Sequence, residues 1–296
     1  MLPGFTLPCF AKINWTLRIL GKHNDGFHEI LTVFQTVSLH DSLIFGEGNE
    51  VRLTCNYRYL PTDGRNLIMK AATALQQKFS VSKGASIHLE KRIPSPGGLG
   101  GGSADAAGAL IGLKRLWQID CSIQELREIA AGIGSDVPFF LYGGTALGMG
   151  RGEVIESVDD LSELYLLIVT PNVRVSTRVA FAGLAAPTLT NEALDHNLSV
   201  CRLEARSLDL RHSALINDFE KSVFDAFPEI GRVKNTLLEL GAVNAALSGS
   251  GASVFAVFDK EETRQAAQKA LEQESTWRKF AVSTVSRSEY REALRC

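Results

Sequence analysis

Hydrophobic and polar residues follow two different periods in the first half of the chain, and these periods predict its secondary structure. Alternating or β-branched apolar residues predict strands at 5–20, 29–39 and 85–89. Apolar residues that recur every three or four positions predict helices at 66–79, 106–117 and 123–133. We expect further strand structure at 41–59, where we place two short strands, and at 139–142, and we interpret 143–153 as a loop or a strand edge.

The second half of the chain shows a simple order of predicted elements. Its strands are expected at 164–170, 243–247, 252–258 and 280–285. Its helices are expected at about 177–184 and 261–274, with additional helices before residue 243. Without the additional helices the order is β-α-β-β-α-β, which is the split βαβ or ferredoxin-like order. The pattern therefore predicts an α+β protein of two domains, residues 1–156 and 157–296.

The most unusual stretch is a glycine-rich loop between the strand at 85–89 and the helix that follows, where five of the six residues from Gly97 to Gly102 are glycine. The first N–H groups of a helix lack partners within the helix, and the helix dipole is positive there. A glycine loop at that end, with Ser103 at the N-cap or in the first turn, is therefore a candidate phosphate site. The loop is not a Walker loop, because no lysine precedes Ser103, and the third glycine of a dinucleotide fingerprint would fall on Ser103.

Local pattern also singles out a few polar residues. Lys12 and Asn14 are two positions apart on the first predicted strand, so they share a face opposite Ile13 and Trp15. That arrangement is equally typical of any strand with one solvent-exposed face. Asp136 follows the predicted helix at 123–133, where the helix dipole is negative and a carboxylate is unfavourable. This position favours a functional role for Asp136.

Composition and charge exclude several classes of protein. A formal net charge of −2 argues against a general nucleic-acid-binding protein, which needs a basic surface. No run of about 18 apolar residues occurs, so we expect no membrane-spanning helix, and the N-terminus has no signal-peptide pattern. Five widely spaced cysteines without a Cys-x-x-Cys pair indicate reduced thiols and no zinc site. We therefore expect a cytoplasmic protein.

The glycine loop resembles the phosphate-binding signature of the GHMP kinase superfamily. Residues 93–107 are most similar to the family within it that phosphorylates 4-(cytidine 5'-diphospho)-2-C-methyl-D-erythritol, here CDP-methylerythritol. Further motifs of that family occur in the same order over nearly the whole chain, at 11–14, 25–28, 66–67, 134–138 and 248–252. The resemblance implies a two-domain GHMP kinase fold, with an N-terminal half similar to domain 2 of ribosomal protein S5 and a ferredoxin-like C-terminal half.

The resemblance also implies roles for individual residues. Lys12 and Asp136 match the catalytic pair. The residues that match the ATP site are Pro94, Ser95, Pro96, Gly97, Gly98, Leu99, Gly100, Gly101, Gly102, Ser103 and Ala104 in the loop, with Asn66 and Lys91 near the nucleotide. The residues that match the substrate side are Asn14, Phe27, His28, Thr177 and Phe181, with Phe27 and Phe181 as the two faces of an aromatic clamp around cytosine.

Three residues depart from the family pattern. Phe27 stands where tyrosine is usual, so stacking is kept and a hydroxyl is lost. Ala104 replaces a frequent serine, which removes a side-chain contact to phosphate. Arg151 occupies a position next to the substrate that is often small or apolar. Its side chain could reach the diphosphate of the substrate, but we expect it to point to solvent.

The resemblance implies ATP as phosphoryl donor, Mg²⁺ from the chemistry of ATP, and no metal ligands that the sequence identifies. The partners implied are ATP and CDP-methylerythritol, with no nucleic acid and no membrane, in a monomer or homodimer. Two other interpretations stay open. One is a kinase for another small alcohol, such as homoserine or mevalonate, against which the segment 25–28 argues. The other is a non-catalytic or RNA-binding protein, against which Lys12, Asp136 and the acidic charge balance argue.

Overall fold

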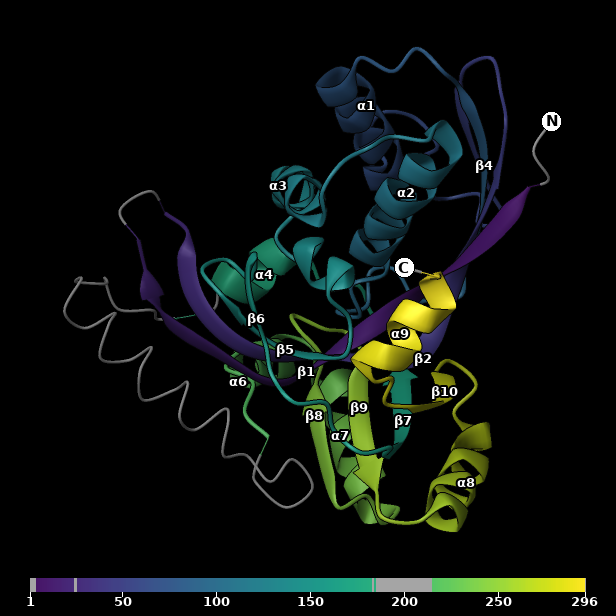
Figure 1. Cartoon of the computed structure of the whole chain (residues 1–296). Coiled ribbons are helices and arrows are strands. Elements are labelled where there is room, and N and C mark those ends of the chain that lie inside the picture. The colour runs from purple at the N-terminus through teal and green to yellow at the C-terminus, as the bar shows by residue number, and fades with distance from the viewer. Residues whose placement is uncertain (1–3, 24–25, 183, 185–214, 296) are drawn as a thin grey trace.

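The computed structural model describes residues 4–23, 26–182, 184 and 215–295. Two β-sheets pack against each other, and helices cover their outer faces (Figure 1). The first sheet runs in the order β3-β4-β2-β5-β6, with β1 paired to β2, and the second in the order β10-β7-β9-β8. The predicted α+β fold is confirmed.

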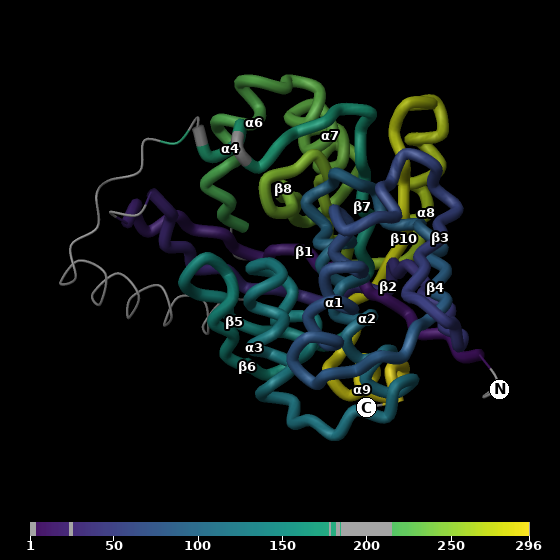
Figure 2. Tube along the Cα trace, turned by 90° about the horizontal axis from the view of Figure 1, so that it is seen from above, coloured from purple at the N-terminus to yellow at the C-terminus, as the bar shows by residue number. Residues whose placement is uncertain are grey.

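A long antiparallel hairpin, β1 (Phe5–Lys22) and β2 (His28–Gly46), forms the centre of the first sheet. Figures 1 and 2 show it running across the width of the molecule, between the helices of the first half and the second sheet. The other strands of this sheet are β3 (Val51–Cys55), β4 (Ala85–Glu90), β5 (Thr145–Met149) and β6 (Val154–Ser157). Because both faces of the hairpin are covered, most of its residues are buried.

Three helices cover the outer face of the first sheet: α1 (Leu67–Phe79), α2 (Gly101–Trp117) and α3 (Ile123–Ile133). Asn66 caps α1 by accepting a hydrogen bond from the Ile68 N–H, and Ser122 opens α3 with a capping box. Small residues of α2 such as Ala106 and Ala109 are fully buried, which allows the helix to lie close to the sheet. These helices match the predicted segments.

The second sheet consists of β7 (Tyr165–Thr170), β8 (Asn244–Leu247), β9 (Val254–Phe258) and β10 (Arg278–Ser283). The helices of this half are α4 (Thr177–Ala182), α6 (Glu220–Ala226), α7 (Pro228–Glu239) and α8 (Glu261–Ala270). All neighbouring strands are antiparallel, and β7 and β9 lie at the centre. The predicted ferredoxin-like order is therefore confirmed.

The two sheets share a hydrophobic core. Ile13 and Trp15 of β1 belong to the same buried cluster as Ile168 of β7 and Phe255 of β9. The rings of Trp15 and Phe255 meet edge to face, with centroids 5.4 Å apart. Because Ile13 and Trp15 fill this core, the alternation of the strand directs Lys12 to its other face.

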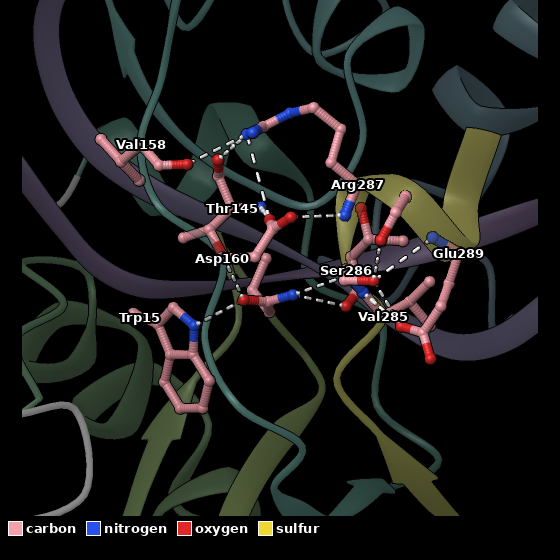
Figure 3. Close-up of polar contacts among 11 residues, drawn as sticks. Trp15, Thr145, Val158, Asp160, Val285, Ser286, Arg287 and Glu289 are labelled. Carbon is pink, nitrogen blue, oxygen red and sulfur yellow. Dashed lines mark hydrogen bonds and ion pairs between the residues drawn. The ribbon is translucent and has the colours of Figure 1, made fainter.

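The C-terminal helix α9 (Arg287–Leu294) returns to the first half of the chain and lies beside α2 (Figure 1). Figure 3 shows how its start is held. The Asp160 carboxylate accepts hydrogen bonds from the N–H groups of Thr145 and Arg287, at 2.8 and 2.7 Å, and the Arg287 guanidinium donates to the carbonyls of Thr145 and Val158. The division after residue 156 stays a prediction, since residues from both sides of it pack together here.

Three expectations about local structure are wrong. Residues 139–142 are not a strand, since Pro138–Leu141 is a 3₁₀ helix; a proline has no N–H for a sheet ladder but suits a first helical turn. The segment 41–59 holds one new strand, β3, because β2 continues unbroken to Gly46. The glycine-rich segment 143–153 contains β5, which is fully buried between β2 and β6.

Candidate active site

A cavity of about 850 Å³ brings most of the predicted site residues together. It lies where the hairpin, the glycine loop, the turn after α3, the start of α4 and the turn between β8 and β9 meet. The predicted residues that line it are Lys12, Asn14, Phe27, His28, Pro94, Ser95, Pro96, Gly97, Gly98, Leu99, Gly100, Gly101, Gly102, Ser103, Asp136, Thr177 and Phe181. Asn66, Lys91 and Ala104 are not among the lining residues.

Lys12 and Asp136 face each other in this cavity. The Lys12 Nζ lies 3.8 Å from Asp136 Oδ2 and donates a 2.6 Å hydrogen bond to Asn14 Oδ1. Asn14 in turn donates to Thr32 Oγ1 at 2.7 Å, so the ammonium is held from behind. Burial lowers the pKa of Lys12, while the Asp136 carboxylate raises it. The Asp136 side chain is 33% exposed, which leaves it accessible to a ligand.

The hairpin has local irregularities on both sides of Lys12 and Asn14. Its register shifts between Phe10 and Ala11, and again between Asn14 and Thr16. Such bulges reorient the side chains next to them and are common beside active sites. Together with the core contacts of Ile13, they explain why two polar side chains of a deeply buried strand point into a cavity.

The glycine loop is fixed through its carbonyl groups. The carbonyl of Leu99 accepts a hydrogen bond from the Lys12 N–H at 3.0 Å, that of Gly97 from the Ser253 N–H at 3.1 Å, and that of Gly98 from the Ser248 hydroxyl at 3.0 Å. The helix α2 then begins at Gly101, so Gly101, Gly102 and Ser103 carry first-turn N–H groups at the cavity wall. N–H groups at a helix N-terminus favour an anion, so this part of the cavity wall could hold a phosphate group.

The turn between β8 and β9 closes the cavity over Lys12. Gly249 has a φ of +54°, and a Cβ placed there would lie 3.2 Å from Lys12 Nζ, so a side chain at this position would crowd the lysine. The Asn217 amide holds the turn by donating to the carbonyls of Leu247 and Gly249, at 2.8 and 2.9 Å. The motif at 248–252 is visible in the sequence, but its contact with Lys12 depends on how the two sheets pack.

Aromatic side chains from the hairpin tip and α4 also line the cavity, and we call this part its aromatic end. The Phe181 ring stacks on His28 with centroids 4.7 Å apart and meets the buried Phe219 edge to face. Burial, and then the charge of Lys22, lower the pKa of His28, so its imidazole is neutral at neutral pH. The hydroxyls of Thr177 and Ser250 lie 3.3 Å apart at the same end.

Phe27 and Arg151 form a second stacked pair in the cavity wall. Phe27 is 49% exposed, and the Arg151 guanidinium lies 3.4 Å from the centre of its ring. Arg151 is exposed, as expected, and its side chain also lines the cavity. The position of Arg151 in the turn after β5 could not be predicted, because we interpreted residues 143–153 as a loop or a strand edge. Asp25, which belongs to the same sequence motif as Phe27, lies outside the described residues.

The three remaining predicted residues lie behind the cavity wall. Asn66 caps α1, with its amide donating to the Pro61 carbonyl at 2.7 Å. Ala104 is buried within α2. The Lys91 ammonium is buried beneath the glycine loop and pairs with Asp41 and Asp105, so it faces carboxylates rather than the cavity. A clue to this cluster is present in the sequence, because Asp105 interrupts a run of small residues.

Comparison with known proteins places this geometry in a family context. Residues 66–144 match the model of the GHMP kinases N terminal domain, and residues 201–275 match that of the GHMP kinases C terminal domain. A 4-diphosphocytidyl-2-C-methyl-D-erythritol kinase of Thermodesulfovibrio yellowstonii is 40% identical over 90% of this chain and 94% of its own length. A protein of the same name from Syntrophotalea carbinolica is 38% identical over 93% of this chain and 97% of its own.

Solved structures show the same relation. The crystal structure of a 4-(cytidine 5'-diphospho)-2C-methyl-D-erythritol kinase superposes with a TM-score of 0.76 at 30% identity, covering 95% of this chain and 99% of that one. A homoserine kinase from Cytophaga hutchinsonii superposes with a TM-score of 0.74 at 20% identity, over 97% and 96% of the two chains. At that lower identity the likeness concerns the fold alone.

Proposed function

Because the chain belongs to the 4-diphosphocytidyl-2-C-methyl-D-erythritol kinase family of GHMP kinases, we propose that it transfers the γ-phosphoryl group of ATP to the 2-hydroxyl of CDP-methylerythritol. The products are the 2-phosphate and ADP, in the non-mevalonate route to isopentenyl diphosphate. The observation that carries the proposal is the Lys12–Asp136 pair, which faces one cavity together with the first turn of α2.

Phosphoryl transfer needs little covalent catalysis by the protein, so the site must mainly position the reactants and stabilise charge. The N–H groups of the first turn of α2 bind the phosphates of ATP. Asp136 accepts the proton of the acceptor hydroxyl, and Lys12, held by Asn14, orients that hydroxyl and stabilises the charge on the transferring group. Lys12 is buried on this side, and a side chain at Gly249 would crowd its ammonium.

The aromatic end of the cavity would hold the cytidine group. Phe27 and Phe181 each offer a ring next to a polar partner, Arg151 and His28. A neutral imidazole can donate one hydrogen bond and accept another, as recognition of a base edge requires. In this proposal the base stacks at one end of the cavity, and the alcohol reaches Asp136 near the other.

Magnesium would enter with ATP. Mg²⁺ commonly takes one or two protein carboxylates together with substrate phosphates. Among the described residues, Asp136 is the only carboxylate that lines the cavity, and no group of three metal-ligating side chains occurs. The donor set therefore fits an ion held by the ATP phosphates and at most Asp136. When bound, the ion would neutralise phosphate charge.

The binding partners, the cellular location and the oligomeric state of the protein also remain proposals. Small molecules are its expected partners, and a cytoplasmic monomer or homodimer stays a prediction. Within the described part of the chain, no helix combines the length and apolar character needed to cross a membrane.

The test is ADP release with a panel of acceptors. We expect release with CDP-methylerythritol and background rates with homoserine and mevalonate, with the product carrying one new phosphate on the 2-hydroxyl by ³¹P NMR. Release with homoserine or mevalonate instead would assign the chain to another GHMP kinase activity. A melting-temperature shift with ATP, but no release with any acceptor, would favour a non-catalytic binding protein.

A further inference from the structure

A buried cluster of three charged side chains lies directly under the glycine loop. Lys91 Nζ pairs with Asp41 Oδ2 and donates a 2.9 Å hydrogen bond to Asp105 Oδ2. The exposed fractions of the three side chains are only 4%, 0% and 3%. None of the three lines the cavity, so the cluster acts on the site from behind its wall.

The cluster joins both ends of the loop to the central hairpin. Asp41 lies on β2, and its Oδ1 accepts hydrogen bonds from the N–H groups of Arg92, at 2.5 Å, and Ile93, at 2.8 Å, just before the loop begins. Asp105 lies on α2, just after the loop ends. Lys91 connects the two, and a Cβ placed at Gly101 would lie only 2.8 Å from its Nζ. The position of the first-turn N–H groups therefore depends on this cluster.

The charges of the cluster do not balance when all three groups are ionised. One ammonium faces two carboxylates, and Asp105 Oδ1 is buried without a hydrogen-bond partner among the described residues. Burial raises the pKa of Asp105 to about 7, although Lys91 lowers it and Asp41 raises it further. Burial lowers the pKa of Lys91, but the two carboxylates bring it above its ordinary value.

The two cysteine thiols near Asp105 do not supply a positive charge that would neutralise the second carboxylate. The Cys9 thiol on β1 faces the same cluster, and burial raises its pKa well above the usual value, so it stays neutral. Burial also raises the pKa of the Cys55 thiol on β3. The uncompensated charge therefore belongs to Asp105, next to a site that must accept several negative phosphates.

We propose that Asp105 is a positioning residue of the phosphate loop and that ATP binding is linked to uptake of one proton by its carboxylate from solvent. The neutral carboxyl removes the repulsion between the cluster and the phosphates, while Lys91 and Asp41 keep the loop in place. The inference rests on the proposed function, since it assumes that the loop binds ATP.

The test is calorimetric titration of the full chain with MgATP, without acceptor, in two buffers of different ionisation enthalpy between pH 6 and 9. We expect proton uptake by the wild type near pH 7 to 8, and less uptake by Asp105→Asn, which imitates the neutral carboxyl. Ionisation of the nucleotide itself is common to both proteins and cancels in the difference. Asp136→Asn is the control, because it removes the carboxylate in the cavity and should keep the uptake.

Kinetics provides a second readout that a purely structural role would not change. The KM for ATP of the wild type should rise about tenfold from pH 6 to 8.5, the scale of one nearby charge at an effective dielectric constant of about 20, while that of Asp105→Asn stays flat. Equal proton uptake and equal pH profiles in both proteins would overturn the inference alone. A wild type that binds no MgATP would overturn the proposed function as well.

Discussion

The two ends of the cavity are built in different ways. The glycine loop is held by hydrogen bonds to its own carbonyl groups and by a buried charge cluster, so its shape is a property of the backbone. The aromatic end is made of side chains on the hairpin tip and on α4, and Phe27 there is half exposed. Under the proposed function, the ATP end therefore depends on backbone geometry, whereas the acceptor end depends on individual side chains.

The largest effect on kcat should come from replacing Asp136, the proposed base between the two ends of the cavity. Asp136→Asn keeps the size of the side chain but removes the base, so kcat should fall by about 10²- to 10⁴-fold while ATP and CDP-methylerythritol still bind. Steady-state kinetics and ligand-dependent melting temperatures measure both quantities. The exposed Asp159, changed to Asn, is the matched control. A near-normal kcat in Asp136→Asn would remove Asp136 from the mechanism.

Lys12→Met should also act on the chemical step. The thioether fills the space of the buried lysine stem but cannot stabilise charge, so we expect kcat to fall about 10²-fold with ATP affinity nearly unchanged. The melting temperature should not fall much, because burial already disfavours the charged form of Lys12. Lys269→Met, at an exposed position on α8, is the control. Loss of ATP binding with intact kcat would place Lys12 in the nucleotide site instead.

The backbone character of the ATP end can be tested at two adjacent glycines. A Cβ at Gly102 would meet only Leu67, at 3.8 Å, so Gly102→Val should fold and block phosphate, raising the KM for ATP by about 10- to 100-fold. A Cβ at Gly101 would meet Lys91 and Ile93 at 2.8 and 2.9 Å, so Gly101→Val should lose stability instead.

The control for the glycine experiment is Gly132→Val, on an open face of α3 outside the cavity. It should leave the melting temperature nearly unchanged, because valine is no poorer a helix former than glycine, and it should not change the KM for ATP. If Gly102→Val binds ATP as the wild type does, the nucleotide phosphates lie elsewhere.

The side-chain character of the acceptor end predicts an effect confined to acceptor binding. Phe27→Ala should lose one stacking surface, worth about 1–3 kcal/mol, and so raise the KM for CDP-methylerythritol roughly 5- to 150-fold with unchanged KM for ATP. Stability should hardly change, since Phe27 is 49% exposed. The control is Tyr59→Ala, another exposed aromatic residue under an arginine. A large melting shift with unchanged acceptor KM would make Phe27 a packing residue.

Short-range sequence pattern is sufficient to predict a feature that depends on a single helix, strand or loop. The helices at α1, α2 and α3 and the strand β4 follow from short-range periodicity and capping residues such as Ser122. The shared face of Lys12 and Asn14 follows from strand alternation alone. The role of the glycine loop as a candidate anion site could likewise be predicted from composition at a helix start.

Long-range packing accounts for what could not be predicted. The Lys91 side chain could not be placed, because its partners lie on β2 and α2, 50 and 14 positions away in sequence. The stacking of Arg151 on Phe27 could not be predicted, because no local pattern brings these two residues together. The buried strand β5 was missed because its glycine at 148 lies against the Phe34 ring, a contact between strands that short-range pattern does not report.

The most direct test of the central claim uses the inactive Asp136→Asn protein, titrated calorimetrically with MgATP and CDP-methylerythritol, singly and together. If one cavity has two ends of different construction, both ligands should bind to one molecule at the same time. Adding Gly102→Val should then weaken only MgATP, and adding Phe27→Ala should weaken only CDP-methylerythritol. Mutual exclusion of the two ligands, or weakening of both by either substitution, would contradict the account.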